Sequence, residues 1–247
     1  MNSSATCWAG PILGLAGAVA IVLAALEPLG NQDLVTWWVL HRAMTAGNAL
    51  PLIGLGAAMA FVRWWQAGFG IAAFAAGAAF GFRTHSSFIA FMAFAPNAAD
   101  HLFLTEPISL LAAGLLLIVP VSLTRWLVTP SAFVIGAMLA NKIALTDPTL
   151  DGWRVSFIGV GLGLWAVVTT FLSIRAFYKA WLPIGFRIVG SWFIAIGLLY
   201  GGSSLVARPT LPSLPDDNLA VPAQRNEFPQ IDEPRRRLRP DGFSVEP

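Results

Sequence analysis

The feature that most constrains this chain is a series of long apolar segments with few charged residues. Most are long enough to cross the ~30 Å hydrocarbon core of a bilayer as a helix. Seven segments can be delimited, at residues 10–26, 49–65, 67–82, 105–124, 130–146, 153–174 and 181–205. None has the alternation of polar and apolar residues that spanning β-strands show. The sequence therefore predicts an all-α, polytopic transmembrane bundle of about seven membrane-spanning helices.

Composition supports this class. Charged residues make up 11% of the chain and hydrophobic residues 56%, whereas soluble domains carry about 25% charged residues. No basic patch with interleaved aromatic residues accompanies the net charge of +2, so a nucleic-acid partner is not expected. The single cysteine, Cys7, excludes an intrachain disulfide and a cysteine-based metal cluster. The expected partner is the lipid bilayer.

The first segment, 10–26, resembles a signal peptide's apolar core. No Lys or Arg precedes it, and no Ala-x-Ala cleavage site follows at a convincing position. We therefore predict a retained helix, which would leave six membrane helices if it were cleaved after all. Another segment, 86–96, is too short to span, and we interpret it as interfacial or re-entrant.

Orientation is predicted from the short connections. Four basic residues lie in or next to short connections that contain no acidic residue: Arg63, Arg125, Arg175 and Lys179. Because Lys and Arg accumulate in cytoplasmic loops, we place this side in the cytoplasm of a bacterial inner membrane, with the N-terminus inside. The side that carries the histidines and most acidic residues, together with the C-terminal tail, is then outside.

The chain divides into a transmembrane domain, 1–207, and a polar tail, 208–247, in which eight prolines occur from Pro209 onward. Such a tail cannot bury enough apolar surface to fold alone. It is either a solvated tail or an arm that docks on another membrane subunit through Phe228, Leu238 and Phe243. The GxxxG pairs Gly77/Gly81 and Gly197/Gly201 allow close helix packing, within the bundle or against a partner.

No arrangement of catalytic residues and no cofactor motif is recognisable, so we expect neither an enzyme nor a bound cofactor. One charged residue requires a partner, because an ammonium group in mid-bilayer costs at least ~2.5 kcal/mol. This residue is Lys142, which lies within 130–146. Asp147 or Glu106 could pair with it, either as a structural ion pair or as part of a path for a solute.

Histidine is the commonest ligand for nickel-like and zinc-like ions. A site could form on the outer side if the loops brought together His41, Asp33, His85, Asp100 and His101. The alternative, that these are ordinary residues at the water interface, is favoured because no fixed helical spacing links them.

The order of the segments and the closing "FRIVGSWFIAIGLLYG" (186–201) resemble the HupE/UreJ family of hydrogenase- and urease-associated nickel or cobalt permeases. The resemblance implies a transporter fold and a metal site that includes His41. Gly47 and Asn48 stand where the family's first motif has Asp and His. The segment "MLANKIALTD" has no histidine, and only Asp147 matches the acidic end of the second motif.

Two functions are therefore expected as alternatives. The first is a transporter of HupE/UreJ-like fold that handles a small solute or a metal ion, with Lys142 suited to an anionic solute. The second is a non-catalytic accessory or assembly subunit of a larger membrane complex, held by Gly/Ala-rich helix faces and by the Pro-rich tail.

Overall fold

The computed structural model describes residues 3–26, 33–43, 45–92, 104–147 and 152–206, and every regular element in these ranges is helical. The elements are α1 (Ser3–Ala25), α2 (Leu34–Trp38), the π-helical turn η1 (Val39–Ala43), α3 (Ala46–Ala60), α4 (Trp64–Met92), α5 (Thr105–Ile118), α6 (Val121–Thr146), α7 (Gly152–Ala176) and α8 (Leu182–Val206). Each predicted apolar segment overlaps a helix, so the all-α class is confirmed.

Five of the described helices are long and apolar enough to cross a membrane: α1, α4, α6, α7 and α8. A sixth span is possible if α2–η1 and α3, which meet at an angle of 69°, count as one bent segment. The 14-residue α5 is apolar but shorter. The chain is thus an integral membrane protein with five or six candidate spans among its described residues, where the sequence predicted about seven.

Two prolines explain why the predicted boundaries around residue 120 were displaced. The helix break falls at Val119 and Pro120, which both have extended backbone with ψ near 150°. A proline disfavours the helical conformation of the residue before it, so α5 ends at Ile118. Pro130, in contrast, lies inside α6. A proline within a helix costs roughly 3 kcal/mol, and this cost is offset here by the buried packing of α6.

The segment predicted as interfacial also differs from expectation. Residues 86–92 continue α4, which runs for 29 residues to Met92, and residues 93–96 lie outside the described part of the chain. The helix formed because its apolar residues continue past Arg83 without a proline or a helix-ending glycine.

Glycines hold the central helices together. On α4, Gly77 and Gly81 lie against the backbone carbonyls of Phe133 and Ala137 on α6. From the α6 side, Gly136 lies equally close to the backbone of Phe74. The second GxxxG pair packs on α5, where Gly197 and Gly201 contact Pro107. Both pairs therefore serve packing within the bundle, where small residues let backbones approach.

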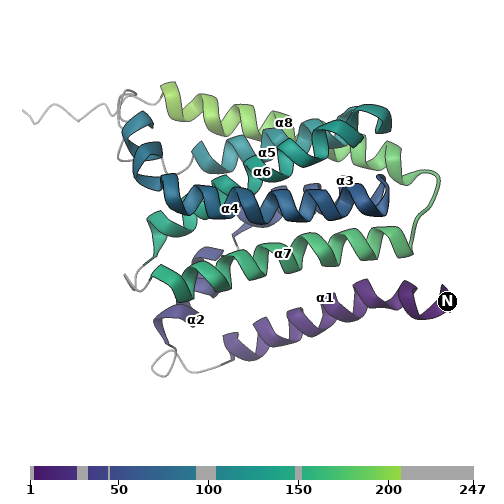
Figure 1. The fold of residues 1–247 in the computed structure, drawn as a ribbon, viewed down its shortest axis with the longest axis horizontal. Coiled ribbons are helices and arrows are strands. Elements are labelled where there is room, and N and C mark those ends of the chain that lie inside the picture. Colours follow the sequence, from purple (N-terminus) through teal and green to yellow (C-terminus); the bar gives the residue numbers. More distant parts are fainter. Residues whose placement is uncertain (1–2, 27–32, 44, 93–103, 148–151, 207–247) are drawn as a thin grey trace, which may run out of the picture. The chain divides into compact units, whose positions relative to one another are not determined.

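The outer helices present apolar side chains to the surroundings. α1 packs on α7, with Gly10 against the backbone of Ser173, and Figure 1 shows α1 at the edge of the helical layer. Large apolar side chains are exposed along α1 and α8: Ile12, Leu15, Val19, Leu23, Ile184, Ile188, Trp192 and Leu199. Exposed apolar patches of this kind fit contact with lipid.

The turns α3–α4, α5–α6 and α7–α8 lie at the end of the bundle where α1 begins (Figure 1). We call this the basic end, because Arg63, Arg125, Arg175 and Lys179 all lie in or next to these turns. The guanidinium of Arg175 lies 4.4 Å from the centroid of the Trp64 ring and donates a hydrogen bond to the carbonyl of Val62 (3.0 Å). The opposite end carries the candidate site.

Candidate functional site

The centre of the site is an ion pair between two helices. Lys142, one turn before the end of α6, pairs with Glu106 in the first turn of α5. The side chains are 15% and 22% exposed, respectively. Of the two partners expected for Lys142, the structure therefore has Glu106. An ammonium group that has lost most of its water needs such a compensating charge.

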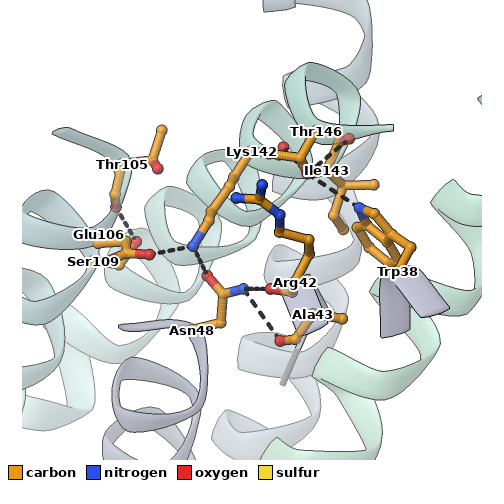
Figure 2. Close-up of polar contacts among 10 residues, drawn as sticks. All are labelled: Trp38, Arg42, Ala43, Asn48, Thr105, Glu106, Ser109, Lys142, Ile143 and Thr146. Atoms are coloured by element: carbon orange, nitrogen blue, oxygen red, sulfur yellow. Dashed lines mark hydrogen bonds and ion pairs between the residues drawn. The ribbon is translucent and has the colours of Figure 1, made fainter. Parts of the chain in front are cut away.

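Asn48, in the first turn of α3, links this pair to the bent helix (Figure 2). Its side-chain oxygen accepts a hydrogen bond from Lys142 Nζ at 2.8 Å. Its side-chain nitrogen donates to the backbone carbonyls of Arg42 and Ala43, both at 3.1 Å. These carbonyls lie at the end of η1, where the helix breaks. Non-helical backbone at membrane depth is tolerated where side chains satisfy it, and Asn48 does so here.

Gly47 makes the close approach of α5 to α3 possible. A β-carbon at residue 47 would collide with the carboxylate of Glu106. The carboxylate therefore occupies the space beside the first turn of α3 that a side chain would otherwise fill. This position also places negative charge near a helix N-terminus, where the helix dipole favours it.

Two of the three helices that line the recess at this site, α3 and α5, are short, and the third is α6. α3 and α5 have 15 and 14 residues, or about 22 Å and 21 Å, whereas the 29 residues of α4 extend about 43 Å. The recess contains about 10 Å³ of free space, about enough for one water molecule. The polar residues that line it are Asn48, Thr105, Glu106, Ser109 and Lys142.

A second connection joins α2 to the end of α6. Trp38 is 1% exposed, and its ring nitrogen donates a hydrogen bond to the hydroxyl of Thr146 at 3.3 Å. The Thr146 hydroxyl in turn donates to the carbonyl of Lys142 at 2.8 Å. The bent segment is thus held to α6 at two points, by Asn48 at Lys142 and by Trp38 at Thr146 (Figure 2).

His41 does not face this recess. Its Nδ1 lies 3.0 Å from the carbonyl of Trp37, and its ring stacks on the Trp37 ring with the centroids 5.0 Å apart. The side chain is exposed. These local contacts fit the interpretation of His41 as an interface residue, which the sequence favoured.

Asp147 lies elsewhere as well. It lines a groove of about 670 Å³ between α4, α6 and α7, together with His85 and Ser156. Of the other predicted residues, Asp100, His101, Phe228, Leu238 and Phe243 lie outside the described part of the chain. Among the residues that the structure describes, no three His, Cys, Asp or Glu side chains come together in a way that could hold a metal ion.

Sequence reasoning missed the roles of Asn48, Gly47 and Trp38. The first two were recognised only as departures from a metal motif. The sequence pattern at Gly47 and Asn48 could have indicated these roles. A small residue just before an apolar helix lets a polar group of another helix approach the helix start, and the amide that follows can form a hydrogen bond there. No local pattern, however, reveals that α5 supplies this group.

No family model matches the chain, and neither the curated proteins nor the solved structures yield a significant match.

Proposed function

We propose that this integral membrane protein transports a small polar solute and that the recess at Lys142 is its central binding site. The observation that carries the proposal is the Lys142–Glu106 pair, which joins the end of α6 to the first turn of α5 beside the bend that precedes α3. Ionisable residues inside membranes mark solute or ion paths by default. Transporters commonly build their sites from broken helices whose N-termini point at the solute.

A divalent metal ion is a poor candidate for the solute. The recess offers one carboxylate and one amide oxygen, and the Lys142 ammonium would repel a cation. Nickel-like ions need several nitrogen or carboxylate ligands to replace their water. The resemblance to the HupE/UreJ family remains a prediction about the fold, and Gly47 and Asn48 replace the ligands that it would supply.

The accessory-subunit alternative rests on Gly/Ala-rich helix faces and on the Pro-rich tail. The glycine pairs that could have formed a partner face are occupied by α6 and α5. The role of the tail, 208–247, remains a prediction. Stoichiometric co-purification with a larger complex, released when residues 208–247 are deleted, would favour this alternative.

Flux in proteoliposomes tests the transport proposal. We would measure the uptake of labelled nitrate, phosphate, glycine and urea by the wild type and by Lys142→Met. The matched control is Lys179→Met, which removes an exposed lysine at the basic end. Uptake of at least one solute should be lost in Lys142→Met and retained in Lys179→Met. Equal fluxes in the wild type and Lys142→Met for every solute would refute the proposal.

A further inference from the structure

We infer that the solute is a small monovalent anion of carboxylate size, which displaces Glu106 from Lys142 and enters together with one proton that neutralises Glu106. The inference rests on the proposed function and names the class of its substrate. It follows from the charge, the space and the surroundings of the ion pair.

Charge balance gives the first argument. The recess is lined by one ammonium, Lys142, and one carboxylate, Glu106, so its two charges cancel. An added anion would leave an excess negative charge, and an added cation an excess positive charge, in a place where water is largely excluded. Uncompensated charge there is costly. Exchange of the carboxylate for an external anion, with a proton left on Glu106, keeps the sum at zero.

Space gives the second argument. The free volume of about 10 Å³ cannot admit a solute beside the pair, so a solute can bind only where a side chain leaves. Glu106 is the group suited to leave, because its carboxylate lies against Gly47, which has no side chain to retain it. Lys142 is held by both Glu106 and Asn48. The carboxylate therefore acts as a tethered anion in an anion site.

The surroundings of the pair offer an anion one positive charge and one helix N-terminus. α6 contributes Lys142. α3 contributes its first turn at Gly47 and the Asn48 amide, whose oxygen faces Lys142 and whose nitrogen is bonded to the carbonyls of Arg42 and Ala43. On α5, Thr105 and Ser109 are neutral, and Ser109 donates to the Thr105 carbonyl at 2.8 Å. Among the described residues that line the recess, Glu106 is the one carboxylate.

Chemical rescue tests the anion site separately from transport. Glu106→Ala removes a methylene and a carboxylate, a fragment that acetate reproduces. We expect acetate, at about 100 times its Kd, to raise the melting midpoint of purified Glu106→Ala by roughly 5–10 °C. Acetamide should have no effect. Acetate should not stabilise the double variant Glu106→Ala/Lys142→Met, which lacks the ammonium. No shift with acetate, or an equal shift with acetamide, would overturn the anion site.

Proton coupling is tested first on the wild type and then on a variant of Glu106. Nitrate is the probe, because it is planar, carboxylate-sized and does not cross membranes as a neutral acid. An inward nitrate gradient should acidify proteoliposomes that contain a trapped pH dye, without a change in membrane potential. Glu106→Gln, which carries no titratable group, should abolish the acidification. Nitrate uptake that carries net charge would refute the coupling.

The two proposals can fail independently. Rescue by acetate without flux of any solute would retain the anion site and overturn transport. Flux of glycine or urea that depends on Lys142, without rescue by acetate, would retain transport and overturn the anion inference.

Discussion

Lys142 shows how one buried charge organises its neighbours. Its ammonium group contacts a carboxylate from α5 and an amide oxygen from α3, so three helices meet at one atom. The net stability gained from such a pair is small or negative compared with an apolar core, but the loss of one partner is expensive. The pair is therefore better explained by a functional role than by a contribution to stability.

This asymmetry predicts the outcome of a double-mutant cycle. Glu106→Gln and Lys142→Met should each destabilise the protein by about 2–4 kcal/mol, somewhat less than in a fully buried pair because both side chains retain some exposure. The double variant should be destabilised by far less than the sum, because no unpaired charge remains. Unfolding in mixed micelles, followed by tryptophan fluorescence, would measure all three. Additive effects would show that the groups do not interact.

Gly47 provides a second prediction at this scale. Gly47→Ala introduces a methyl group that must displace the Glu106 carboxylate, so we expect a loss of about 1–3 kcal/mol through overpacking and a weakened pair. Gly68→Ala on α4 is the matched control, since a β-carbon there meets open space. Replacing a helical glycine at such a site should be neutral or stabilise by up to about 1 kcal/mol. The same micelle assay compares the two, and equal effects would contradict the close contact at Gly47.

At the scale of elements, the arrangement depends on which helices approach backbone to backbone. α4 and α6 do so at Gly77, Gly81 and Gly136. This contact positions α6, and therefore Lys142, against the rest of the bundle. Since lipid supplies no hydrophobic drive for helices to associate, the contact relies on close packing of small residues.

Gly77→Val should accordingly separate α4 from α6. Its side chain would meet the backbone carbonyl of Phe133, which cannot move aside as a flexible side chain could. We expect a loss of about 1–3 kcal/mol or more and lower yields of monodisperse protein on fluorescence-detected gel filtration. Gly161→Val on α7, where nothing lies within 4 Å, should behave like the wild type. A tolerated Gly77→Val would refute the backbone contact.

At the scale of the whole molecule, the described helices expose apolar side chains around the bundle. The short turns at the basic end carry basic residues without acidic neighbours, and Trp64, Trp126 and Trp181 lie next to them. The recess at Lys142 opens toward the other end. If the basic end faces the cytoplasm, as Lys and Arg in short turns favour, the recess faces outward.

Cysteine labelling tests this orientation. In a Cys7→Ser background, Asp33→Cys and Lys179→Cys place single thiols at exposed positions near opposite ends of the bundle. An impermeant maleimide should label Asp33→Cys in intact cells and Lys179→Cys only in inverted vesicles. The reverse pattern would invert the assigned orientation. Labelling of both from one side would contradict the bundle itself.

The sequence by itself determined the membrane class, the positions of the main helices and the need of Lys142 for a carboxylate. These properties are local or compositional: a backbone in lipid must satisfy its own hydrogen bonds, and a buried charge must be compensated. The tertiary structure decided which carboxylate forms the ion pair with Lys142. It also decided that the helix is interrupted at Pro120 and not at Pro130, and that Asn48 bridges the break between η1 and α3. The choice of Glu106 depends on a contact between helices that are separated in sequence. The other two depend on backbone geometry at single residues, at Pro120 and at the carbonyls that Asn48 binds, which the apolar pattern of a segment does not contain.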